Sequence, residues 1–219
     1  MGGSQQKKEL EKVEGQKMIN ARVKIEGFLK IFDPVSNEIF FDGPNSIHYE
    51  NFSEALAYSI GNKGQNYVYE MHFGNGGTSI DPTGVISYLP PNTAAQGADL
   101  YNDTYHKIVD DTSSLNTDPL RNFIQVRHVT GLTYTDLFVS CLLDYGEPVD
   151  QAAFDNSQNL NGQYVFDELG LKGYSSAGAG TGPLLTHVIF HPVQKSLNRL
   201  LQIDYTVRIS ALTNLTSVI

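Results

Sequence analysis

Hydrophobic and polar positions alternate with a period of two in several separate stretches of the chain, a pattern that predicts β-strands. The clearest case is 200–209, where Leu201, Ile203, Tyr205, Val207 and Ile209 alternate with polar side chains. The same pattern and apolar runs predict strands within 22–32 and at 38–42, 67–73, 85–89, 105–109, 123–129, 134–143, 164–171 and 184–190, with His191-Pro192 interrupting the last. Ten stretches of this kind favour a β protein.

One segment has the period of a helix instead. Within 45–61, an apolar stripe recurs at helical spacing, formed by Phe52, Ala55, Leu56, Ser59 and Ile60. Asn51 and Glu54 have the spacing of a capping box, although the helix could begin earlier, near Ser46. Gly61 stands where a left-handed C-terminal cap is expected. His48 is predicted to be a helix-entry residue, with a ligand role as the alternative.

These elements predict a mainly β fold: an antiparallel β-sandwich of jelly-roll type with one short amphipathic helix and long loops. A single domain is expected at 22–210, entered through a hairpin and the helix at 22–61. The segment 1–21 is expected to be a flexible arm, because 1–16 is charged and nearly free of large apolar side chains. Such an arm would order, if at all, against a neighbouring subunit. The uncharged, β-prone extension 211–219 is expected to pack on a neighbour or to extend the sheet.

A glycine-rich break interrupts the chain after the strand at 67–73. Gly74, Asn75, Gly76 and Gly77 indicate positive φ angles or a close approach of the backbone to another group. A second turn follows at 81–84. We interpret 67–91 as a rigid loop system on a β scaffold and a candidate interaction site.

Glu168 is the second candidate, because strand alternation places it on the same face as Phe166, which we expect to be the core side. A buried carboxylate needs partners, so it is expected to accept backbone N–H bonds or to pair with a cation such as Lys195. Asp167 is expected to matter much less. The alternative, a catalytic acid, lacks a visibly paired second carboxylate.

Composition excludes several classes of function. The 219 residues carry a formal net charge of −9, which argues against specific nucleic-acid binding. No apolar run approaches the ~18 residues that would predict a membrane span. The single cysteine, Cys141, lies in an apolar run and is predicted to be a buried strand residue rather than a catalytic thiol.

Motifs for catalysis and metal binding are not found. There is no nucleophile elbow, HExxH, paired-cysteine zinc spacing or dinucleotide fingerprint. The polar run 99–111 could supply oxygen ligands to calcium, but its spacing matches no EF-hand loop. We therefore expect no enzymatic activity, cofactor or metal.

The order of several pieces resembles structural proteins of tailed bacteriophages. These pieces are the hairpin-turn-helix at 28–61, HFGNGGT at 72–78, the apolar strand 137–143, FDELGL at 166–171 and the ending at 184–209. The resemblance covers most of residues 22–210. It implies a virion protein of the neck, collar, head-to-tail connector, tail or fibre-attachment type. Homo-oligomers that join portal, tail or fibre proteins are expected of that class, located in the virion.

Two other functions stay open at this point. A host-recognition or carbohydrate-binding module would use tyrosine-rich loops, although the chain has no Trp. A hydrolase of cell wall or polysaccharide would need paired carboxylates in a groove.

Overall fold

The computed structural model describes residues 21–148 and 163–213, which contain one helix and eleven strands. These elements are β1 (Ala21–Phe32), β2 (Ile39–Ile47), α2 (Tyr49–Ile60), β3 (Val68–Gly74), β4 (Thr78–Ile80), β5 (Ile86–Tyr88), β6 (Asp103–Ile108), β7 (Phe123–His128), β8 (Tyr134–Leu143), β9 (Gln163–Gly173), β10 (Thr186–Ser196) and β11 (Leu201–Thr213). Nine strands form one sheet in the order β6-β3-β9-β10-β2-β1-β11-β8-β7, and β4 pairs only with β5. Every pairing between strands is antiparallel.

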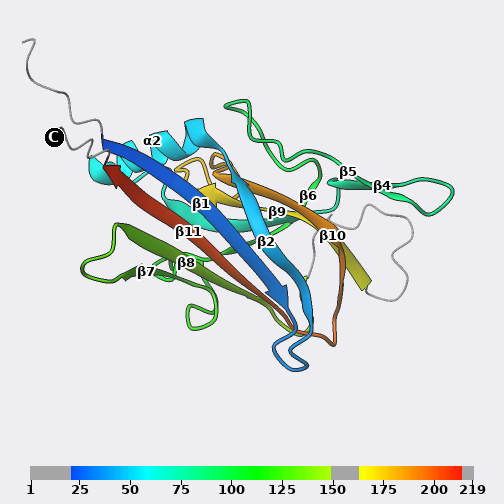
Figure 1. The fold of residues 1–219 in the computed structure, drawn as a ribbon. Helices are drawn as coiled ribbons and strands as arrows, with labels where there is room; N and C mark the ends of the chain where they lie inside the picture. The colour runs from blue at the N-terminus through cyan, green and yellow to red at the C-terminus, as the bar shows by residue number, and fades with distance from the viewer. Residues whose placement is uncertain (1–20, 149–162, 214–219) are drawn as a thin grey trace, which may run out of the picture.

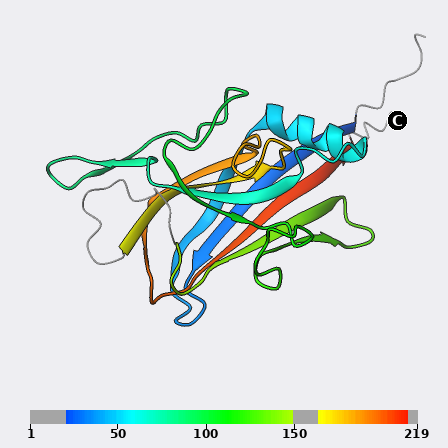
Figure 2. The ribbon, with the colours of Figure 1, turned by 180° about the vertical axis from the view of Figure 1, so that it is seen from behind.

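The predicted fold class is confirmed: the protein is mainly β and antiparallel, with one short helix in the described residues. The sheet curls strongly, so its two halves face each other across a common core (Figures 1 and 2). The facing layers that a sandwich requires are therefore halves of one sheet. Their inner faces supply a core that includes Leu29, Phe73, Leu169 and Tyr205.

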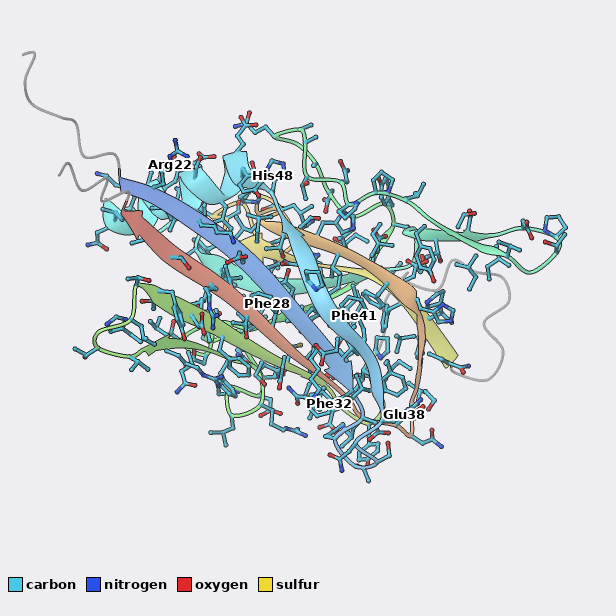
Figure 3. The ribbon with its side chains drawn as sticks, viewed as in Figure 1. Arg22, Phe28, Phe32, Glu38, Phe41 and His48 are labelled. Carbon is cyan, nitrogen blue, oxygen red and sulfur yellow. The ribbon has the colours of Figure 1, made fainter. Side chains whose placement is uncertain are left out.

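The longest ladder of the sheet joins the two ends of the described chain. β1 and β11 pair without interruption from Ala21 opposite Thr213 to Phe32 opposite Gln202. Arg22 and Phe32 mark the two ends of β1 in Figure 3. Because β11 continues to Thr213, the first residues of the predicted extension 211–219 extend the protein's own sheet. Residues 214–219 and most of the predicted arm, 1–20, lie outside the described residues.

The helix agrees with the sequence at its buried face and differs at its ends. Phe52 and Ala55 are buried, but Ile60 is exposed. The N-cap is His48, whose Nδ1 accepts a hydrogen bond from Asn51 N at 3.3 Å. The left-handed cap predicted at Gly61 is wrong, because Gly61 has a φ of −76° and Asn62, with a φ of 51°, turns the chain instead.

His191-Pro192 does not end the strand that it interrupts. β10 continues to Ser196, and its pairing with β9 changes register between Ile189 and Val193. The shift accommodates proline, which has no N–H to give to the ladder.

The hairpin of β4 and β5 projects from the body beyond the end of the curled sheet (Figure 1, right). Its turn is fixed by Asp81, whose Oδ1 accepts bonds from Thr83 N and Val85 N at 2.8 and 3.0 Å. The hairpin is thus a defined arm rather than an irregular loop.

Candidate functional site: a buried charged layer beneath the loops

The strands β3 and β9 place charged side chains on one face and apolar side chains on the other. Their register sets Glu70 opposite Lys172, His72 opposite Gly170 and Gly74 opposite Glu168. The opposite face carries Met71, Phe73, Leu169 and Leu171, all in the apolar core. We call Glu70, His72, Asp103, Asp167, Glu168, Lys172 and His187 the charged layer.

Glu168 is completely buried and accepts four hydrogen bonds. Its Oε1 accepts from Gly76 N at 3.0 Å and Asn102 N at 2.8 Å. Its Oε2 accepts from Tyr101 N at 2.8 Å and lies 3.0 Å from His187 Nε2. The predicted burial and backbone hydrogen bonding of Glu168 are therefore confirmed, and the loops it holds are 74–77 and 99–103.

The imidazole of His187 has a defined tautomer in this arrangement. Its Nδ1 accepts a bond from Asn92 N at 2.8 Å, so the proton that faces Glu168 is on Nε2. Burial acts to raise the pKa of Glu168. The bonds from His187 and from three backbone N–H groups outweigh it, and the pKa is lowered. Glu168 is thus held as a carboxylate.

Asp167 anchors the next residues of the same loop. It is 3% exposed and accepts bonds from Gly77 N and Thr78 N, both at 2.9 Å, and from the Thr78 hydroxyl. Burial raises its pKa despite these bonds. The expectation that Asp167 matters much less than Glu168 therefore rests on a wrong premise, because both carboxylates are buried and both hold the loop.

Close packing explains two glycines of the predicted loop. A Cβ on Gly74 would lie 2.5 Å from Glu168 Oε1, and one on Gly76 would lie 2.7 Å from Asn102 N. Neither residue has a positive φ, so close approach, one of the two predicted reasons, applies here. Gly77 is buried against Asp167, and Asn75 Oδ1 accepts a bond from Asn102 Nδ2 at 2.5 Å.

A second cluster in the layer centres on His72, which is 1% exposed. Its Nδ1 lies 2.6 Å from Asp103 Oδ2 and its Nε2 lies 2.8 Å from Glu70 Oε2. Burial acts to lower the pKa of His72. The bonds to Asp103 and Glu70 raise the pKa by more than burial lowers it, so the net shift is upward. Both ring nitrogens can donate only in the protonated ring, so His72 is a buried cation between two carboxylates.

Lys172 completes this cluster and ties it to two loops. Its ammonium lies 2.7 Å from Asp99 Oδ1 and 3.3 Å from Asp103 Oδ2, and it donates to Gly180 O at 3.3 Å. Glu70 Oε2 accepts from Gly180 N at 2.7 Å. The polar run 99–111, considered above for calcium, thus supplies Asp99 and Asp103 to a lysine and a histidine.

Lys195 is not the partner of Glu168. It is completely buried elsewhere, and its ammonium donates to the carbonyl oxygens of Asp144, Glu147 and Ser196 at 2.8–3.0 Å. Burial lowers the pKa of Lys195 to about 8. The side chain that reaches Glu168 comes instead from β10: it is His187, whose Nε2 donates to Glu168 Oε2 at 3.0 Å.

Phe166 and Glu168 do not share a face, contrary to the prediction from alternation. The ring of Phe166 packs at 5.2 Å from that of Phe73, whose partner across the sheet is Leu169. Glu168 lies opposite Gly74, on the other face. Regular alternation fails because the pairing with β10 shifts register at this point.

The contacts of the charged layer hold the adjoining loops in fixed positions. Its carboxylates are occupied by loop N–H groups or cations, and both nitrogens of His72 are engaged. Glu168 and Asp167 are at most 3% exposed, so a polysaccharide does not reach them in this conformation. Within 21–148 and 163–213, no group of three or more His, Cys, Asp and Glu is arranged to hold a metal ion. Cys141 is completely buried, and burial raises the pKa of its thiol to about 12.

Sequence reasoning missed four members of the layer: Glu70, His72, Lys172 and His187. A signal was present, because Glu70 and His72 stand two residues apart in an otherwise apolar strand. Glu168 and Lys172 stand four residues apart, with Gly170 midway between them, and therefore follow the same period of two.

No helix in the part of the chain that the structure describes is long and apolar enough to cross a bilayer. Comparison with protein-family models, with curated proteins and with solved structures gave no match.

Proposed function

We propose that this protein is a structural subunit of a tailed-bacteriophage particle that assembles as a homo-oligomer and joins neighbouring virion proteins. The neck, collar, head-to-tail connector and tail are the places that the sequence resemblance favours. The observation that carries the assembly role is the projecting β4–β5 hairpin. Four large apolar side chains are exposed on it and beside it: Ile80, Val85, Tyr88 and Leu89, at 65, 58, 53 and 44%.

A small hairpin with this surface is suited to contact another protein. Apolar side chains grouped on a projecting element mark interaction surfaces more often than single exposed residues do. The base of the hairpin is fixed by Asp167, through Gly77 N and Thr78 N. A rigid arm loses little conformational entropy on docking, which favours assembly.

The assembly role is tested with Ile80→Asp in the full chain. Val35→Asp is the matched control, because Val35 is 69% exposed in the turn between β1 and β2. We expect the wild-type protein to form a closed oligomer in electron micrographs and in sedimentation. Ile80→Asp should weaken association at least tenfold, and Val35→Asp should not. A wild-type protein that stays monomeric, or an oligomer indifferent to Ile80→Asp, contradicts the role proposed for the hairpin.

The place in the virion needs its own experiment. Antibodies against the purified protein should label one defined position on the particles of the phage that encodes it. Particles that are not labelled, or whose protein content lacks this chain, would show that the protein is not a subunit of the virion.

A carbohydrate-binding role is the second candidate, favoured by a tyrosine cluster. Tyr67, Tyr69 and Tyr174 line a hollow of about 410 Å³ together with Ser113 and Ser114. The rings of Tyr67 and Tyr174 stack at 5.1 Å with an interplanar angle of 8°, so part of their surface is already used. Binding on a glycan array that Tyr174→Ala abolishes would favour this function over assembly alone.

A further inference from the structure

An apolar groove lies open between α2 and the inner faces of β7, β8 and β11. It has a volume of about 500 Å³, and the side chains that line it include Phe52, Leu56, Ile124, Val126, Leu137 and Ile209. Val126 pairs with Leu137 across the β7–β8 ladder, yet it stays 69% exposed. The groove is therefore a part of the inner, core-facing surface that the described residues leave uncovered.

This groove continues to the place where the described chain begins and ends. A second hollow of about 380 Å³ shares Thr135 and Ile209 with it and reaches Val23 and Ala211. Val23 and Ala211 pair with each other and lie two residues from Ala21 and Thr213. A segment that precedes Ala21 thus starts beside one end of the groove.

The charges of the groove and of the N-terminal segment are complementary. Asp110, Asp111 and Asp136 line the groove. Of these three carboxylates, only Asp136 forms an ion pair with a cation of the described residues, Arg208. The segment 1–20 carries four lysines, at 7, 8, 12 and 17, and three glutamates, at 9, 11 and 14, so its side chains have a net charge of +1; its apolar side chains include Leu10, Val13, Met18 and Ile19. It therefore offers apolar side chains to cover the groove and lysines to pair with its carboxylates.

Length and charge suit the N-terminal segment to this groove. Its twenty residues reach about 66 Å when extended, at ~3.3 Å per residue, and can follow the groove to Asp111. Residues 214–219, which follow the other strand end beside the groove, contain no cation.

We propose that residues 1–20 dock in this groove on the body of their own chain. The tether at Ala21 gives the segment a high effective concentration at the groove, which favours its own chain over a neighbour. Docking covers Val126, Ile124 and Leu137 and brings lysines to Asp110 and Asp111. This differs from the expectation from the sequence, in which the arm orders only against a neighbouring subunit. It is also independent of assembly through the β4–β5 hairpin.

Disulfide trapping in the full chain tests the docking directly. The pair Glu11→Cys with Val126→Cys is compared with the control pair Glu11→Cys with Val35→Cys. Val126 and Val35 are equally exposed, at 69%, and Cys141 is buried and does not compete. We expect the first pair to form a link within one chain at least fivefold faster than the control. Equal rates, or links only between chains, overturn the proposal.

Trypsin cleavage gives a second readout that needs no engineered thiol. The four lysines of 1–20 are cleavage sites, and docking protects them. Val126→Asp should speed their cleavage about fivefold or more, whereas Val35→Asp should leave the rate unchanged. Circular dichroism at the same temperature establishes that both variants are folded. Identical cleavage in wild type and both variants contradicts the docking.

Discussion

Replacing Glu168 by alanine is the most direct test of the charged layer. The change leaves four donors without their acceptor: the N–H groups of Gly76, Tyr101 and Asn102, which are partly buried, and Nε2–H of the buried His187. A buried donor left unsatisfied costs about 1–3 kcal/mol. Water entering the space of the lost side chain recovers part of that, so we expect a loss of about 3–5 kcal/mol in the free energy of unfolding.

Glutamine at the same position separates charge from shape. Glu168→Gln keeps an oxygen for Gly76 and Asn102, but its amide group then faces the N–H of Tyr101 and of His187. His187 cannot resolve this conflict by changing tautomer without losing its bond from Asn92 N. We therefore expect a loss of about 2–4 kcal/mol, smaller than for alanine.

Urea unfolding followed by far-ultraviolet circular dichroism measures these losses, because the chain has no Trp to report by fluorescence. Glu38→Ala is the matched control: its carboxylate is 61% exposed and pairs with Arg199 on the surface. An exposed pair of this kind contributes at most about 1 kcal/mol. If Glu168→Ala costs no more than Glu38→Ala, the carboxylate does not hold the loops and the reasoning fails.

Three further predictions concern the same layer. Asp167→Ala should lower the free energy of unfolding by about 2–4 kcal/mol, close to Glu168→Ala, because three donors lose their acceptor. A loss below about 1 kcal/mol in the same urea titration would refute this. The raised pKa of His72 means that its contribution is complete below its unfolded value of 6.5 and is lost as pH rises through the folded pKa. Wild-type stability should therefore fall as the pH rises above 6.5, and stability should change less in His72→Asn over the same pH titration. Gly76→Ala should cost about 1–3 kcal/mol by thermal melts because its Cβ meets Asn102 N, whereas Gly97→Ala, with no atom within 4 Å, should be neutral.

The strands were predictable because their signal is local. Alternation in 200–209 and the apolar run at 134–143 depend only on neighbouring residues, and both strands formed as expected. The turn of the first hairpin was equally predictable, because Asp33 Oδ1 accepts hydrogen bonds from Val35 N and Ser36 N within the turn itself. Local hydrogen bonding of this kind leaves a pattern in the sequence.

The partners of the buried charges were not predictable because they are distant in sequence. Lys172 meets Asp99, and Glu168 meets the N–H of Gly76. Such pairings follow from strand order, and the order β3-β9-β10 cannot be read from alternation alone. Lys195 was the predicted partner of Glu168, whereas the structure places His187 of β10 there, with its Nε2 3.0 Å from Glu168 Oε2.

The composition of the charged layer indicates what it contributes. Apolar residues in place of a buried ion pair are often as stable or more so, and stability alone therefore does not explain charges in β3 and β9. These side chains bind the main chain of the loops: Glu168 at 76, 101 and 102, Asp167 at 77 and 78, and Glu70 at 180. An apolar side chain would cover the strands but could not accept these N–H groups, which would then be buried without partners.

It follows that the layer fixes where the loops lie and, through Gly77 and Thr78, where the β4–β5 hairpin points. The apolar side chains of the hairpin can dock on a partner only if the base holds a defined direction. A variant such as Asp167→Ala, studied where it remains folded, should then weaken assembly although no exposed residue of the hairpin has changed. The interaction surface that we propose therefore depends on carboxylates that no partner touches.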